Sequence, residues 1–443
     1  MAAEREQYPR LGHSSPGRDG RGWVPVLTRD GWLLFATCAI RTFAYGFVSV
    51  ILGLYLASLS YDTATIGAIF TAVLAGDAAI TILLTQVADR LGRRRVLLVG
   101  AALMALAGTA FAATDNVVLL TVAAIVGVIS PSGKEVGPFS SLEQAILPQT
   151  SSDDQRTHVF AAYNLVGSLA GAVGALAVGL PGLLGLGPVA ANRSLLWAYA
   201  AMGGLLAVVF TRLSPAVEAG DRPAAGAARA PLRFGLHRSR NVAIKLAALG
   251  ALDSFGTGFI VQGLLAYWLS LRFGADIEVL GVIFFGTNLF SAVSFLAAVP
   301  LARRFGLLNT MVFTHLPSNI LLMLVPLMPT LELAVLVLLA RQLLSQLDVP
   351  TRQSYTMAIV DPDERAAAAG LSSVARNTAS AIAPVFAGAT LAVPALGLPF
   401  LIAGSLKSIY DLALFAVFRK VRPPEERARQ EQREECGHDV GHA

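Results

Sequence analysis

Long apolar segments, separated by short polar connections, run through most of the chain. A helix needs about 20 apolar residues to cross the hydrocarbon core of a bilayer, and about twelve segments reach that length. Several are longer, which indicates helices that tilt or extend beyond the bilayer. The pattern predicts an all-α membrane protein with about twelve transmembrane helices. The predicted spans lie near residues 31–59, 63–87, 95–113, 117–146, 157–181, 194–213, 242–271, 277–302, 307–328, 331–360, 365–393 and 398–418.

The polar connections fall into two classes by charge. Arginine-rich connections alternate with connections that are mostly acidic. Because cationic segments resist translocation, we expect the arginine-rich side and both chain termini to face the cytoplasm, in a multi-pass protein of the cell membrane. The expected cytoplasmic side carries Arg5, Arg10, Arg18, Arg21, Arg29, residues 88–95, residues 214–241, Arg303, Arg304 and the tail after 419, and the outer side carries Arg193, Arg272, Asp62, Asp115, Asp276, Glu278 and Glu332.

A segment rich in proline, alanine, glycine and arginine separates the spans into two groups of six. Its composition is typical of a flexible linker. The N-terminal tail is polar and has no apolar core of a signal peptide, so we expect the first span to direct insertion. The predicted domains are the N-terminal tail 1–30, a six-helix bundle 31–213, the linker 214–241, a second six-helix bundle 242–418 and the C-terminal tail 419–443.

The two groups of spans repeat each other. Offsets of 212, 214 and 209 residues align the first span with the seventh, the second with the eighth, and the fourth and fifth with the tenth and eleventh. Parallel repeats of six spans are typical of transporters built from two bundles. Identical residues at aligned positions include the pairs Phe43 and Phe255, Gly46 and Gly258, Gly67 and Gly281, Arg90 and Arg304, Gly92 and Gly306, Gln144 and Gln353, and Gly179 and Gly388.

Composition agrees with a membrane protein and excludes several functions. Hydrophobic residues make up 55% of the chain and charged residues 14%, with a mean hydropathy of +0.62. Lysine and arginine exceed the acidic residues, 34 to 29, but they gather in loops and tails, so we expect no nucleic-acid binding. The two cysteines and six histidines show neither a disulfide framework nor metal-ligand spacing. No nucleophile–base arrangement is present, so we expect no cofactor, no metal and no enzyme activity.

The connection between the second and third spans, Thr85–Leu97, is short and strongly basic. It resembles the signature loop of the major facilitator superfamily, G-x-L-A-D-R-x-G-R-(R/K), with Thr85 and Val87 in place of its first Gly and its Leu. The resemblance implies two pseudo-symmetric six-helix bundles that transport a small-molecule substrate by alternating access, as a monomer. It also implies that the loop's Asp anchors it near the start of the eleventh helix, where Arg365 is a candidate partner. The matching loop residues are Asp89, Arg90, Gly92, Arg93 and Arg94.

The fifth span is similar to half of the family's antiporter signature, G-x-x-x-G-P-x-x-G-G. Gly167, Gly171 and Gly174 are in their approximate places, but Ala172 stands where the proline is expected. The resemblance favours export only slightly.

Charged and polar residues of the tenth span share one face. Arg341, Ser345, Asp348, Arg352 and Tyr355 stay within roughly 40° of one line on a helical wheel. In the family the first, fourth, seventh and tenth helices line the central cavity, so the resemblance puts this stripe there. The alternative is that Asp348 neutralises Arg352 at i,i+4 as a structural clamp.

The fourth span contains an unusual stretch at residues 130–138. Two prolines and two glycines there predict a distorted or broken helix. Lys134 and Glu135 at mid-depth are candidates for a substrate or proton site, as in the broken helices of transporters. A hinge with a self-neutralising Lys–Glu pair is the alternative. A phosphate-binding P-loop is rejected, because Val128 and Glu135 occupy positions that the motif gives to Gly and Ser or Thr.

The repeat suggests a cytoplasmic gate made of four charges. It aligns Arg41 with Asp253 and Glu143 with Arg352, so opposite charges occupy equivalent places in the two halves. We predict that Arg41 pairs with Asp253 and Glu143 with Arg352 when the cavity opens outward.

Other polar residues within the spans have simpler interpretations. Asp77 has no cationic neighbour in sequence, and burial raises the pKa of a lone carboxylate, so it suits a proton carrier, although a partner from another helix is equally plausible. Tyr45 joins Tyr355 as a candidate cavity residue. Lys407 and Asp411 lie at i,i+4 and are expected to neutralise each other. Arg376 of the eleventh span suits either a carboxylate partner from the side of the signature loop or the cavity, and the sequence does not decide between them.

The sequence therefore predicts a secondary transporter of a small organic solute, coupled to protons, with a slight preference for export. The alternatives are proton-symport uptake of an organic anion or zwitterion, and a membrane sensor or receptor that has kept the transporter fold. Protons and the lipid bilayer are the other expected partners.

Overall fold

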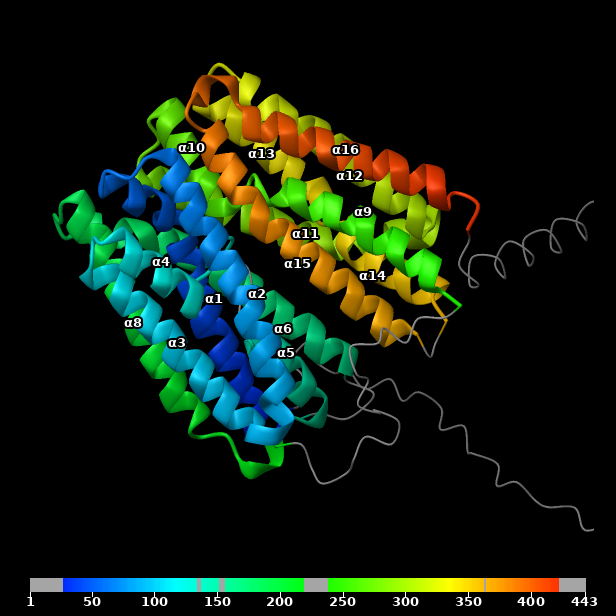
Figure 1. Ribbon diagram of the computed structural model, residues 1–443, viewed down its shortest axis with the longest axis horizontal. Helices are drawn as coiled ribbons and strands as arrows, with labels where there is room; N and C mark the ends of the chain where they lie inside the picture. Colours follow the sequence, from blue (N-terminus) through cyan, green and yellow to red (C-terminus); the bar gives the residue numbers. More distant parts are fainter. Residues whose placement is uncertain (1–26, 134–136, 151–155, 219–237, 362–363, 422–443) are drawn as a thin grey trace, which may run out of the picture.

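The computed structural model describes residues 27–133, 137–150, 156–218, 238–361 and 364–421. All regular structure in these ranges is helical, and the helices form two halves that lie side by side (Figure 1). The first half contains α1 (Arg29–Ser58), α2 (Thr63–Leu91), α3 (Arg93–Ala113), α4 (Val117–Val126), α5 (Phe139–Ile146), α6 (Arg156–Leu176), α7 (Leu180–Leu183) and α8 (Pro188–Phe210). The second contains α9 (Arg240–Gly258), α10 (Gln262–Phe273), α11 (Ile277–Phe305), α12 (Leu307–Leu324), α13 (Leu331–Ser345), α14 (Asp348–Ile359), α15 (Arg365–Thr390) and α16 (Leu398–Phe418).

The helices confirm the predicted all-α membrane fold. Ten segments of the described chain are long and apolar enough to cross a membrane, and α4 is a shorter apolar helix. The eleventh predicted span, α15, is more polar than these ten, and it packs against α2 of the first half as well as α9. Most of the predicted linker, residues 219–237, lies outside the described ranges.

Three predicted spans are each divided into two helices. The break that proline and glycine predicted in the fourth span is confirmed, since α4 ends at Val126 and α5 starts at Phe139. The seventh and tenth spans are divided as well, so the helical wheel of the tenth span, which assumed one continuous helix, does not apply across its break. The seventh is interrupted between α9 and α10, and the tenth between α13 and α14.

Local chemistry explains the two unpredicted breaks. Pro350 has no N–H for the carbonyl of Gln346, and its ring crowds that carbonyl, so α13 cannot run on into α14. At the end of α13, the Gln346 N–H donates to Ser294 Oγ of α11 at 3.3 Å. In the seventh span, the N–H of Gly263 donates to Pro131 O of the other half at 3.0 Å and not to its own helix.

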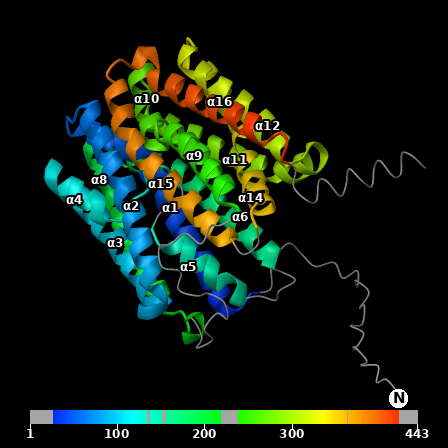
Figure 2. The ribbon, with the colours of Figure 1, turned by 45° about the vertical axis from the view of Figure 1, so that its right-hand side comes forward.

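The two halves touch at one end of the molecule. The start of α1 and the end of α16 share one end, here named the terminal end, and the opposite end is the remote end. Helices α2 and α15 lie together at the remote end and diverge toward the terminal end in both views (Figures 1 and 2). A Cβ on Gly67 would lie 2.4 Å from Pro384 O and 2.8 Å from Gly388 Cα, so only glycine permits this approach. The Val385 N–H donates to Thr71 Oγ1 at 2.9 Å nearby.

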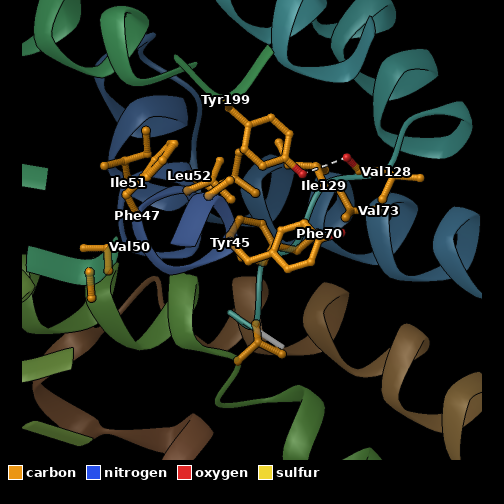
Figure 3. Close-up of a cluster of buried hydrophobic side chains, with 14 of the residues drawn as sticks. Tyr45, Phe47, Val50, Ile51, Leu52, Phe70, Val73, Val128, Ile129 and Tyr199 are labelled. Atoms are coloured by element: carbon orange, nitrogen blue, oxygen red, sulfur yellow. Dashed lines mark hydrogen bonds between the residues drawn. The ribbon is translucent and has the colours of Figure 1, made fainter. Parts of the chain in front are cut away.

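Aromatic residues fill the core of the first half beside the break in the fourth span. Tyr45 and Tyr199 pack with ring centroids 6.3 Å apart, next to Phe70 (Figure 3). The Tyr199 hydroxyl donates to the carbonyl of Val128, which no longer has a helical partner, at 2.8 Å. Tyr45 is completely buried, so it does not line a solvent-facing cavity in this structure, unlike the prediction.

Candidate functional site

A group of charged side chains lies inside the second half, around Asp253 of α9. Lys407 Nζ is 2.7 Å from one oxygen of this carboxylate, and the Nη1 atoms of Arg376 and Arg352 are 3.3 and 3.4 Å from the other. Asp253 is only 4% exposed. A buried charge in a membrane-spanning region is costly without partners, and here three helices (α14, α15 and α16) each supply one.

Two glycines make room for these long side chains. Gly250 and Gly256 lie three residues before and after Asp253, on the same face of α9. A Cβ on Gly250 would lie 3.3 Å from Arg376 Cγ, and one on Gly256 would lie 3.1 Å from Lys407 Cγ. Arg376 and Lys407 therefore reach Asp253 across a surface of α9 that has no side chains.

A second carboxylate, Asp411 of α16, has a different set of partners. Its oxygens are 2.9 and 3.0 Å from His315 Nδ1, and Asn319 Nδ2 donates to it at 2.8 Å. The other ring nitrogen of His315 is 4.0 Å from Asp253. The predicted pairing of Lys407 with Asp411 is therefore wrong, because Lys407 binds Asp253 on another helix.

The polar stripe of the tenth span is divided by the break. Asp348 pairs with Arg352 at 3.0 Å, as the structural alternative expected, but Arg341 lies on the other side of the break in α13. Tyr355 is completely buried and donates to Val421 O at 2.9 Å, so it does not face a cavity here. Tyr355 belongs to the core, with its ring against Phe418.

Arg341 is paired less completely than the other cations of this group. Its Nη1 donates to Gln342 Oε1 at 2.7 Å. Its Nε is buried and has no hydrogen-bond partner among the residues that the structure describes. Arg341 interacts electrostatically with Asp253 and Asp348, but neither of these carboxylates accepts a described hydrogen bond from it.

The first half holds a separate buried ion pair. Arg41 Nη1 and Nη2 donate to the two oxygens of Glu143 at 2.9 and 3.1 Å, and both side chains are completely buried. Tyr163 and Thr37 also donate to Glu143, and the Arg41 guanidinium lies over the ring of Phe139. The network attaches α5, which follows the break, to α1 and α6.

The predicted cytoplasmic gate is not formed in this arrangement of the halves, and for the state in which the cavity opens outward it stays a prediction. Neither the Arg41–Asp253 nor the Glu143–Arg352 pair is present. Arg41 pairs with Glu143 inside the first half, and Asp253 pairs with Arg352 inside the second. Equivalent positions in the repeat point into their own bundles, where each charge finds a partner on a neighbouring helix.

The broken fourth span joins several helices through its main chain. The N–H of Gly137 donates to Asp77 of α2, and Pro131 O accepts from Gly263 of the other half. A side-chain bond joins the halves separately from the fourth span: Gln262 Nε2 of α10 donates to Ser49 Oγ of α1 at 2.9 Å. Lys134 and Glu135, the predicted site residues of this stretch, lie outside the described residues.

The glycines that resemble an antiporter signature pack the fifth span against the first. A Cβ on Gly174 would lie 2.0 Å from Phe43 O, and one on Gly167 would lie 3.3 Å from Cys38 Sγ. Gly171 O in turn approaches Gly46, where a Cβ would lie 2.2 Å away. Close contact between α1 and α6 therefore requires glycine at positions 46 and 174, whereas a Cβ on Gly171 would lie at an ordinary 3.5 Å from Thr42 O.

The signature loop forms the turn between α2 and α3 at the terminal end. Gly92 has φ of +94°, which favours glycine. The Arg93 and Arg94 N–H groups donate to the Glu218 carboxylate at 2.6 and 3.3 Å, which caps the start of α3. Arg90 is exposed. The side chain of Asp89 is not among those described, so its contact with Arg365 stays a prediction.

We predict that Gly92→Ala destabilises the protein by about 1–3 kcal/mol, the usual cost of such a backbone conformation in a residue with a side chain. The added Cβ would also lie 3.1 Å from both Glu218 oxygens. The matched control is Gly204→Ala in α8, which meets nothing within 4 Å and should be neutral or stabilising. Thermal unfolding in detergent compares them, and equal midpoints for the two variants would contradict the prediction.

Sequence reasoning missed part of the charged group. It left the partner of Arg376 open and gave no role to His315 or Asn319, which bind Asp411. One signal was present in the sequence: the two glycines spaced three residues on either side of Asp253 leave room for long partners.

Comparison with known proteins supports a common fold and family. The sequence profile of the Major Facilitator Superfamily matches residues 34–347 and again residues 246–439. The chain is 32% identical to the uncharacterized membrane protein YJR124C of Saccharomyces cerevisiae over 422 residues, which cover 88% of this chain and 94% of that protein.

The fold is similar to those of several transporters of known structure. The nucleoside transporter NupG is 16% identical, with a TM-score of 0.68 over 88% of this chain and 99% of that one. A D-xylose-proton symporter is 15% identical, with a TM-score of 0.64 over 87% and 97%. The human organic anion transporter MFSD10 is 19% identical, with a TM-score of 0.59 over 87% and 99%. Identities this low show a shared fold alone.

Proposed function

Because the chain belongs to the Major Facilitator Superfamily, we propose that it is a secondary active transporter that moves a small organic solute across the cell membrane by alternating access. The main support is the position of the contacts between the halves. Three hydrogen bonds join the described residues of the two halves in the middle and at the remote end: Pro131–Gly263, Ser49–Gln262 and Thr71–Val385. With the termini in the cytoplasm, this arrangement corresponds to an inward-facing state.

Proton coupling and export are the finer parts of the proposal. The sequence has no nucleotide-binding motif, so an ion gradient is the default energy source. Carboxylates within the spans are the candidates for carrying the proton, namely Asp77, Glu135 and Asp348, to which the structure adds Asp411 with its histidine partner. Half of the antiporter signature favours export, and uptake by proton symport is the alternative.

Proteoliposomes containing a trapped pH dye test the coupling. Pools of organic anions, sugars and cationic drugs are added one at a time, and we expect one pool to change the internal pH. The sign of the change gives the direction of proton movement, and Asp77→Asn, Asp348→Asn and Asp411→Asn then identify the carrier. Flux without any pH change would overturn proton coupling, and no flux at all in folded protein would favour the sensor.

A crosslink across the remote end tests alternating access. Thr71 and Val385 are adjacent where α2 meets α15, since the Val385 N–H donates to Thr71 Oγ1, and in Thr71→Cys with Val385→Cys oxidation or a short bis-maleimide should join the two residues. We expect the crosslink to stop transport and reduction of the disulfide to restore it, since α2 and α15 must separate in the outward-facing state. A matched pair within one half, Asp115→Cys and Arg193→Cys, should leave transport unchanged when crosslinked. Undiminished transport through the crosslinked α2–α15 pair would contradict the mechanism.

A further inference from the structure

The charged group around Asp253 has an excess of positive charge. It contains four permanent cations, Arg341, Arg352, Arg376 and Lys407, and three carboxylates, Asp253, Asp348 and Asp411, among the side chains that the structure describes. Even with His315 uncharged, one positive charge of the group has no counter-ion among these described carboxylates. An uncompensated charge within the spans is costly, so a site for an anion is favoured there.

Two of the cations are more accessible to solvent than the carboxylates, whereas Lys407 is as buried as Asp253. The side chains of Arg376 and Arg352 are 25% and 19% exposed, whereas Asp253 is 4% exposed. Arg376 gives only its Nη1 to Asp253 among its described hydrogen bonds, so its remaining N–H donors are available. The accessible part of the group is therefore made of guanidinium donors.

Arg341 provides a second, independent observation. Its buried Nε has no partner among the described residues, although it lies in a group that is otherwise densely hydrogen-bonded. A buried donor without an acceptor costs free energy that a ligand oxygen would recover. Guanidinium groups bind carboxylates and phosphates through two parallel hydrogen bonds, which neutral or cationic ligands cannot accept equally well.

We propose that this group is the substrate site for an organic anion that carries a carboxylate or a phosphate. The inference rests on the proposed transport function and names its substrate class. The anion binds Arg376 and Arg341 and competes with Asp253 for Arg376. Asp253 stays paired with Lys407 at 2.7 Å, its shortest ion pair. When no substrate is bound, Asp253 is also the counter-ion of Arg376.

Thermal unfolding of the purified full chain in detergent tests the site without any transport measurement. The probes are succinate, benzoate and glycerol phosphate, each compared with its uncharged counterpart: succinamide, benzamide and glycerol. We expect at least one anion at millimolar concentration to raise the midpoint by about 2 °C or more, while its counterpart does not. Equal shifts for charged and uncharged members, or no shift with any anion, would overturn the proposal.

Variants then assign the effect to this group. Arg376→Gln should weaken the binding of the active anion about tenfold, the effect of losing one charge-assisted interaction, and Arg376→Lys should restore part of it. The control, Arg272→Gln, removes an exposed arginine of α10 and should bind as the wild type does. Unchanged affinity in both Arg376 variants would place the anion elsewhere, and the wild-type comparison stands even if Arg376→Gln does not fold.

Failure of this inference differs from failure of the proposed function. Transport of a sugar or a cation, with no stabilisation by any anion, would leave a transporter without this site. Anion binding that depends on Arg376, with no flux in proteoliposomes, would support the site in a protein that senses its ligand.

Discussion

Replacing Glu143 with alanine is expected to lower the thermal midpoint of the purified protein by about 6–10 °C. The substitution leaves the guanidinium of Arg41 without its carboxylate in a fully buried place. Breaking a buried pair by removing one partner costs about 3–5 kcal/mol, and 1 kcal/mol moves the midpoint of a large chain by about 2 °C. The same change frees α5 from α1, so the segment after the break loses its main attachment.

The double variant Arg41→Met with Glu143→Leu is the matched control. It removes both charges and keeps apolar volume, so much of the lost stability should return. Tyr163→Phe, which removes only one donor to Glu143, should cost less than Glu143→Ala. A double variant no more stable than Glu143→Ala would contradict the interpretation that the unpaired charge is the cause.

Asp253→Ala should both destabilise the protein and abolish transport. The change removes the carboxylate shared by Lys407, Arg376 and Arg352. With Arg341, the described group then has four cations and two carboxylates. We expect a loss of stability of about 3–5 kcal/mol. Transport per amount of folded protein, from the monodisperse fraction, should fall by more than about tenfold, since charges within the spans mark the substrate and ion pathway.

The control for Asp253 is an exposed ion pair of the first half. Asp115 and Arg193 pair at the remote end with side chains 56% and 36% exposed. Asp115→Ala should cost no more than about 1 kcal/mol, because water and salt screen exposed pairs. Equal losses of stability in the two variants would show that the Asp253 group contributes no more than a surface pair.

Hydrophobic segments and charged loops were sufficient to predict the helices. Each span must be long enough to cross the hydrocarbon core, and positively charged connections gather on one side of the membrane. The break of the fourth span was predictable from its own prolines and glycines. The breaks between α9 and α10 and between α13 and α14 were not. One depends on a hydrogen bond from Gly263 to the other half, and the other on the single proline Pro350, which often only kinks a membrane helix.

The partners of the charges were the least predictable feature. Lys407 and Asp411 lie at the spacing of a local helical pair, yet each binds a residue of another helix, Asp253 and His315. Local spacing is a weak criterion here, because a tertiary partner in a buried place offers a stronger interaction than an i,i+4 neighbour. The repeat predicted which positions are equivalent, but equivalent positions face into separate bundles.

The hydrogen bond between Pro131 and Gly263 has a consequence for how such a chain can evolve. Both of its atoms belong to the main chain, so a change in the neighbouring side chains leaves the donor and the acceptor chemically the same. Position 263 itself has no room for a side chain, because a Cβ there would lie 2.7 Å from the ring of Phe70. The surrounding side chains can therefore change toward another substrate while this contact between the halves, the joint, stays the same. In descendants of such a chain, the cargo can change faster than the joint.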